Sequence, residues 1–222
     1  MSEAGTMSAG GKGRKVLLQL ILGGICGGVG MFAALTLFEG RSGMKVEPTD
    51  ALALGTALVF GLVGLFVGLG ALAPGFGSRT LNVEDREEIE EQRSTLVIGA
   101  VSFLLVALLV GALVASGSAD RPGLIGTGTA TLIASAATLA LVVWSILHRK
   151  RGDEMMRLAA KDAAVVTTNL IFLVFGTWAG AAHLGLVPMF QSLAFVAGFF
   201  LLYLLGVFIA VGRRGLLGPR RP

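Results

Sequence analysis

Residues 51–73 read ALALGTALVFGLVGLFVGLGALA, a run of 23 residues without one charged side chain. A helix of about 20 residues is long enough to cross a hydrocarbon core about 30 Å thick. Five more stretches have the same character: 16–38, 95–117, 124–147, 163–184 and 189–211. Together they predict an all-α fold, a polytopic membrane bundle of six transmembrane helices arranged as three hairpins.

The composition agrees with a chain that lies mostly in lipid. Hydrophobic residues make up 54% of the sequence and charged residues only 14%, against about 25% charged in a soluble domain. The sequence predicts three parts: a disordered basic cytoplasmic tail over 1–15, a six-helix transmembrane domain over 16–212, and a basic cytoplasmic tail over 213–222. The first apolar stretch is too long for the core of a cleaved signal peptide, so we interpret it as a retained helix.

Lys and Arg are distributed unequally between alternate connections, which predicts the orientation of the bundle. One set of connections and tails carries 15 of them, and the other set carries three, namely Arg41, Lys45 and Arg121. The basic side is expected to be cytoplasmic, which places both termini in the cytoplasm. Because the basic residues flank apolar helices, the net charge of +4 indicates anchoring at the membrane and no nucleic-acid partner. The short loops and the Gly/Ala-rich composition favour a bacterial inner (plasma) membrane.

Two charged segments, 82–94 and 152–162, are predicted as helical turns that run directly into the next apolar stretch. Their similarity leaves open a duplication of hairpins, as in some transporters, although any hairpin protein produces this pattern. The first segment is rich in Glu. We interpret it as a solvated helix face, because its acidic residues lack the spaced pattern and turn glycine of a calcium loop.

Small residues at helical spacing predict close helix packing in the first two apolar stretches. In lipid, close approach of backbones through small residues drives association more than burial of leucine does. The predicted helix-packing residues are Gly23, Gly27 and Gly30 in the first stretch, and Ala57, Gly61, Gly64 and Gly68 in the second. These faces are expected to pack against each other, or to bind another membrane protein or a second copy of the chain.

Polar side chains inside the apolar stretches are few, and they form the other set of candidate positions. Thr127, Thr131 and Thr138 follow one face of the fourth stretch, and their hydroxyls are expected at a helix interface, with the lining of a conduit as the alternative. Asn169 and His183 share a face of the fifth stretch with Gly176 and Gly180. We expect Asn169 to make an interhelical hydrogen bond and His183 to lie near the outer interface.

The sequence offers no pattern for catalysis or for a cofactor. No Asp, Glu, Lys or Arg lies deep in an apolar stretch, although proton- and ion-coupled transporters usually keep one there. The two histidines, His148 and His183, do not stand at a metal-binding spacing, and no plausible base accompanies Ser102 or Ser135. The aromatic sixth stretch is explained by core filling and lipid contact, with a stacked pigment or quinone as an alternative. We therefore expect no enzyme and no cofactor.

These observations favour an integral membrane protein that acts as a non-catalytic helix-packing subunit or accessory protein. The alternative is a small transporter or channel, with a homodimer as one form. A water-accessible cavity at Asn169 or at the threonine stripe would favour transport. A solid core with a glycine face exposed to lipid would favour a subunit that binds a partner.

Overall fold

The computed structural model describes Thr36, Gly40 and residues 47–80, 86–118, 121–148 and 154–214. The chain divides into two compact units, Met1–Met44 and Lys45–Pro222, and all the elements discussed below belong to the second unit. The first apolar stretch lies almost entirely outside the described residues. The prediction of six spans, and of cytoplasmic termini, therefore stays a prediction.

Five described helices are long and apolar enough to cross a membrane. Their bounds are Pro48–Leu72, Ile89–Ala115, Thr127–His148, Arg157–His183 and Ser192–Arg213. At most 33% of the most apolar window of any one of them is buried inside the protein, so each helix presents a large apolar surface outward. This is the expected surface of a multi-pass protein whose surroundings are lipid.

The elements follow the predicted apolar stretches closely. In chain order they are α2 (Pro48–Leu72), α3 (Pro74–Thr80), α4 (Arg86–Ala115), β1 (Gly117–Ser118), β2 (Arg121–Pro122), α5 (Thr127–His148), α6 (Glu154–Ile171), η1 (Phe172–Gly176), α7 (Thr177–His183) and α8 (Ser192–Arg213). The described part of the chain is therefore all-helical apart from one pair of two-residue strands. Both predicted charged lead-ins are helical over their described residues, since α4 begins at Arg86 and α6 at Glu154.

Proline and glycine mark the ends of the helices. Pro48 occupies the first turn of α2, where its missing N–H costs no hydrogen bond. Gly185 follows α7 with φ of 72°. Its N–H donates to the carbonyl of Ala182, and that of Leu186 donates to the carbonyl of Ala181, which is the Schellman arrangement that ends a helix.

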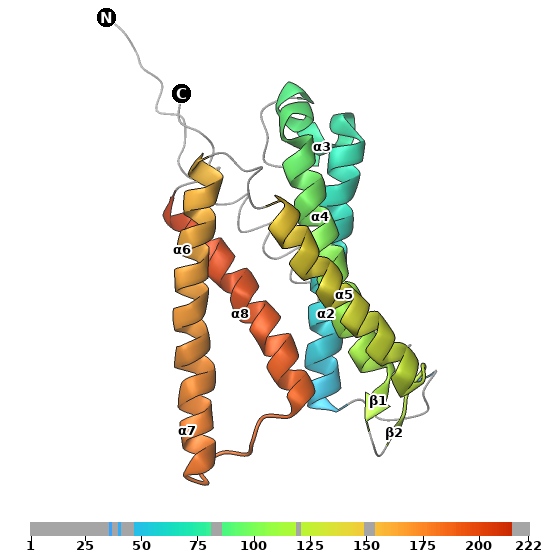
Figure 1. Cartoon of the computed structure of the whole chain (residues 1–222), viewed down its shortest axis with the longest axis vertical. Helices are drawn as coiled ribbons and strands as arrows, with labels where there is room; N and C mark the ends of the chain where they lie inside the picture. The colour runs from blue at the N-terminus through green and yellow to red at the C-terminus, as the bar shows by residue number, and fades with distance from the viewer. Residues whose placement is uncertain are drawn as a thin grey trace, which may run out of the picture. The chain divides into compact units, whose positions relative to one another are not determined.

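The helices form a row of neighbours within this unit (Figure 1). α6 packs on α8, α8 packs on α2 and α4, α2 packs on α4, and α4 packs on α5. The segment α6–η1–α7 therefore lies at one edge, with α8 as its main neighbour, and α5 lies at the other edge. The β1–β2 pair and the connection from α7 to α8 lie at the end opposite to the starts of α4 and α6 (Figure 1).

The core sits where α2, α4 and α8 meet. Phe60 of α2 is 2% exposed, and its ring centroid lies 5.5 Å from that of Phe103 and 6.0 Å from that of Phe200. Aromatic rings at these separations attract one another beyond the area they bury. This three-helix contact fixes α8 against the α2–α4 pair and leaves α6 to be positioned by α8.

Candidate functional site: an uncovered helix face and an apolar cavity

The predicted glycine face of α2 packs against α4. A Cβ built on Gly61 would lie 3.6 Å from the Cβ of Ala107, and one built on Gly68 would lie 3.5 Å from the Cβ of Ala100. At Gly64 the space is tighter, with Leu104 Cγ at 2.9 Å and the carbonyl oxygen of Ala100 at 3.1 Å. Gly64 thus allows two backbones to approach more closely than any larger residue would permit.

The partner face on α4 has the same spacing as the face on α2. Ala57, Gly61, Gly64 and Gly68 meet Gly111, Ala107, Leu104 and Ala100 in that order. Both sets advance in steps of four, three and four residues, which is the interlocking pattern of a left-handed helix pair. Sequence reasoning overlooked the α4 set, and its identical spacing is the signal that would have found it.

Packing of this α2 face against the first apolar stretch is not described by the structure. Gly23, Gly27 and Gly30 lie outside the described residues. The α2 glycines pack against α4 within the same unit. A role of these glycines in binding a second protein is therefore not needed to explain them.

The segment α6–η1–α7 presents an uncovered face with the same kinds of residue. Asn169, Gly176, Gly180 and His183 are all exposed, and Phe172 is 72% exposed. A Cβ built on Gly176 or on Gly180 would meet nothing within 4 Å. We call the surface formed by Asn169, Phe172, Gly176 and Gly180 the open face.

Asn169 is the unusual member of the open face. It lies near the middle of the candidate span Arg157–His183. No hydrogen bond joins its side-chain amide to a residue that the structure describes. A polar group without a partner costs several kcal/mol in hydrocarbon. The expected interhelical hydrogen bond of Asn169 is therefore not made with the described helices, and its side chain is exposed.

A π-helical turn, η1, lies within the open face directly after α6. It places Phe175 inward, where the ring contacts Phe195 at 4.6 Å and Phe190 at 5.1 Å. The hydroxyl of Thr177 donates to the carbonyls of Leu173 and Val174 in this turn, so these two carbonyls of the widened turn have a hydrogen-bond donor. Such π-turns are frequent at functional sites, and the hydrophobic pattern gave no sign of this one.

The threonine stripe of α5 is satisfied by its own helix. Thr131 Oγ1 donates to the carbonyl of Thr127 at 2.8 Å, and Thr138 Oγ1 donates to the carbonyl of Ala134 at 2.8 Å. Thr127, Thr131 and Thr138 are all exposed. The hydroxyls of Thr131 and Thr138 thus have hydrogen bonds without a second helix.

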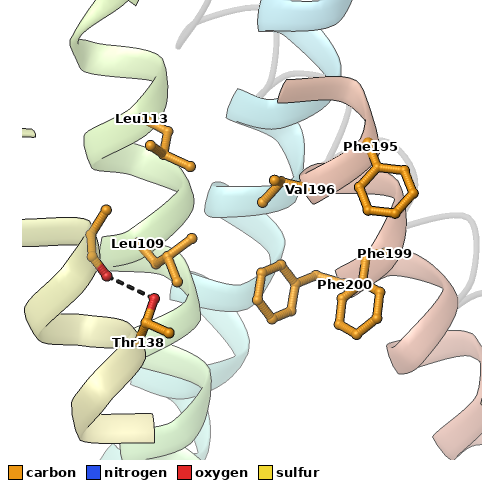
Figure 2. Close-up of a pocket in the computed structure, with 8 residues that line it drawn as sticks. Leu109, Leu113, Thr138, Phe195, Val196, Phe199 and Phe200 are labelled. Carbon is orange, nitrogen blue, oxygen red and sulfur yellow. Dashed lines mark hydrogen bonds between the residues drawn. The ribbon is translucent and has the colours of Figure 1, made fainter. Parts of the chain in front are cut away.

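An apolar cavity of about 390 Å³ lies between α5 and α8, with α4 at its side (Figure 2). Leu109 and Leu113 of α4 and Thr138 of α5 face Phe195, Val196, Phe199 and Phe200 of α8 in the view of Figure 2. The Thr138 hydroxyl, the polar group drawn there, is already bonded to Ala134 (Figure 2). The cavity therefore offers contacts to hydrocarbon and holds no charged group that would attract water or ions.

No metal site is formed by the described residues, which contain no cluster of three His, Cys, Asp or Glu side chains. Comparison of the chain with protein-family models, with characterised proteins and with solved structures gave no match. Any functional assignment must therefore come from the open face, the cavity and the ends of the bundle.

Proposed function

We propose that this integral membrane protein is a non-catalytic helix-packing subunit or accessory protein that binds another membrane protein through the open face. The observation that carries the proposal is the exposed amide of Asn169 near mid-span. In lipid, such an amide is stabilised when a second helix supplies a hydrogen-bond donor or acceptor.

Gly176 and Gly180 support the same proposal, because they allow a foreign helix to approach the Asn169 side of α6–α7 closely. Nothing within 4 Å would obstruct a Cβ at either position, so the glycines are not explained by packing among the described helices. Glycine lowers helix propensity by about 1 kcal/mol relative to alanine. A helix of a partner that carries small residues and one polar side chain would use both features of the open face.

The proposed location is the plasma membrane of a bacterium, with both termini in the cytoplasm. Its support is the strong excess of Lys and Arg in one set of connections, which is typical of the cytoplasmic side. Within Lys45–Pro222, the starts of α4 and α6 and the ends of α5 and α8 share one end of the unit (Figure 1), as alternating hairpins require. Reporter fusions at Met1 and Pro222 test the orientation; reporters on opposite faces would contradict it.

The experiment for the binding role compares Asn169→Leu with Thr131→Leu in native membranes solubilised under mild conditions. Wild-type protein is expected in a complex well above the 22.9 kDa of one chain, measured by native gel electrophoresis and mass spectrometry. Asn169→Leu should shift the protein toward the free chain, because the buried amide contact is lost. Thr131→Leu is the matched control, since its exposed hydroxyl already bonds within α5. An unchanged complex in Asn169→Leu would contradict the proposal.

The alternative function is a small transporter or channel, and the cavity beside Thr138 is the observation that favours it. The two functions differ in whether water reaches that cavity. In a Cys26→Ala background, Thr138→Cys should resist a charged, membrane-impermeant thiol reagent if the protein is a subunit. Rapid labelling would support a water-accessible conduit and would argue against the subunit role.

A further inference from the structure

A second hollow lies at the end of the bundle where α4 begins and α5 ends. Its volume is about 480 Å³. Its lining has two parts: a rim of charged and polar side chains of α4, namely Glu90, Glu91, Arg93 and Ser94, and a wall formed by Val97, Ile98, Trp144 and His148. We call it the interfacial groove, since it joins charged and apolar surface within one hollow.

The lining residues of α4 all belong to one side of that helix. Glu90, Ser94 and Ile98 follow one another at intervals of four residues, which places them in a row along the helix axis. The distance along the axis from Glu90 to Ile98 is about 12 Å at about 1.5 Å per residue. A headgroup region is about 5–8 Å thick on each side of a bilayer, so a row of this length is long enough to reach from headgroups into acyl chains.

The wall of the groove on the α5 side is held in place by hydrogen bonds. Trp144 Nε1 donates to the carbonyl of Ile98 at 3.3 Å, and Ser102 Oγ donates to the same carbonyl at 2.9 Å. The ring of His148 lies 4.1 Å from that of Trp144, with its Nδ1 2.9 Å from the Trp144 carbonyl oxygen. The groove therefore has a fixed indole wall, and tryptophan is the residue that favours the boundary between headgroups and acyl chains.

The rim carries charges of both signs. Glu90 and Glu91 offer two carboxylates, and Arg93 offers one guanidinium, with the Ser94 hydroxyl beside it. All four side chains are exposed and so are open to a ligand. A headgroup with only negative charge would meet the two carboxylates unfavourably. A headgroup with both an ammonium group and a phosphate matches the rim, since carboxylates accept from the ammonium and the guanidinium donates to the phosphate.

We propose that the interfacial groove binds one zwitterionic phospholipid with a primary ammonium group, of the phosphatidylethanolamine type. Glu90 and Glu91 accept hydrogen bonds from the ammonium, while Arg93 and Ser94 donate to the phosphate. One acyl chain runs along Val97, Ile98 and Trp144. The site is separate from the open face, which belongs to α6–η1–α7, so a failure of either proposal leaves the other standing.

The test uses the full chain with Trp178→Phe, which leaves Trp144 as its single tryptophan. The protein is reconstituted in vesicles that contain phosphatidylethanolamine or phosphatidylglycerol, either of them brominated on the upper acyl carbons. Quenching of Trp144 fluorescence then reports which lipid occupies the groove. Brominated phosphatidylethanolamine is expected to quench several-fold more effectively than brominated phosphatidylglycerol at the same mole fraction. Equal quenching by the two lipids would overturn the proposal.

Two variants assign the selectivity to the rim. Glu90→Gln combined with Glu91→Gln should abolish the preference for phosphatidylethanolamine, because the carboxylates that hold the ammonium are gone. Glu87→Gln is the matched control, since Glu87 is exposed on the same helix and does not line the groove; it should retain the preference. A preference that survives the double variant would overturn the assignment.

Two further outcomes identify other ligands and would also overturn the proposal. A preference for phosphatidylglycerol would assign lipid binding to the basic run Arg149, Lys150 and Arg151 instead of the rim. Complete release of quenching by soluble glycerophosphoethanolamine would show that the groove takes a free headgroup without its acyl chains. We expect that compound to compete weakly or not at all with the lipid. The apolar wall at Val97 and Trp144 contributes to binding only when the ligand carries an acyl chain.

Discussion

The α2–α4 contact and the open face of α6–η1–α7 contain the same kinds of small residue, but the structure uses them differently. At the α2–α4 contact, Gly64 meets Leu104 and the Ala100 backbone. On the open face, Gly176 and Gly180 meet nothing within 4 Å. The first set of glycines packs two helices of this unit together, whereas the second set has no neighbour among the described helices.

The polar side chains of these two regions differ in burial and in hydrogen bonding. Thr56 of α2 is 1% exposed, and its hydroxyl donates to the carbonyl of Leu52 at 2.8 Å. Asn169 is exposed, and its amide, which carries two donors and one acceptor oxygen, has no hydrogen bond to a residue that the structure describes. The glycine stripe of α2 thus lies in a packed contact beside a satisfied hydroxyl, whereas the glycines of the open face lie beside an amide that has no hydrogen bond to a described residue.

The largest expected effect comes from placing leucine at the two kinds of glycine. Gly64→Leu should reduce stability by about 3 kcal/mol or more, because overpacking separates α2 from α4. Gly176→Leu, the matched variant on the open face, should change the stability of the isolated chain by less than about 1 kcal/mol. Thermal stability in mild detergent measures both. Equal losses in the two variants would remove the distinction between a packed and an open glycine face.

A smaller loss is expected at the contact that holds α6 to α8. A Cβ on Gly206 would overlap the hydroxyl of Thr167 and lie 3.0 Å from its Cα, so Gly206→Ala should cost about 1–3 kcal/mol. The same measurement of thermal stability applies, with Gly180→Ala as the control on the open face. A Gly206→Ala variant as stable as the control would show that α6 is not held closely by α8.

The smallest effect is expected at Thr167, with the opposite sign. This residue is 5% exposed, and its hydroxyl has no hydrogen-bond partner. Thr167→Val keeps the shape and removes the unsatisfied group, so stability should be unchanged or rise by about 1 kcal/mol. A loss of more than about 1 kcal/mol would mean that the Thr167 hydroxyl has a hydrogen-bond partner, as the Thr56 hydroxyl of the α2–α4 contact does, and would contradict this prediction.

Much of the fold could be predicted from the sequence, because apolar length and helical period are local properties. The stretch 51–73 corresponds to α2, and 124–147 corresponds to α5 within a few residues. The neighbour of each helix could not be predicted in this way. Spacing defines which face of α2 carries Gly61 and Gly64, but it does not say that Ala100 and Ala107 of α4 would lie against that face.

The candidate site was less accessible to sequence reasoning. Asn169, Gly176 and Gly180 could be placed on one face by their spacing, yet their exposure depends on where α8 lies. The η1 turn after Ile171 and the interfacial groove between α4 and α5 arise from contacts between helices. Such features depend on relative helix positions, which a single-helix pattern does not encode.

Site-specific photo-cross-linking tests most directly whether the open face binds a partner. A photoreactive phenylalanine analogue replaces Phe172, which is 72% exposed, and in a second sample replaces Leu132 of α5, which is 73% exposed. The account predicts a discrete protein adduct from position 172 that is lost with Asn169→Leu, and only lipid adducts from position 132. Lipid adducts alone at both positions, or a cross-link confined to one chain, would contradict it.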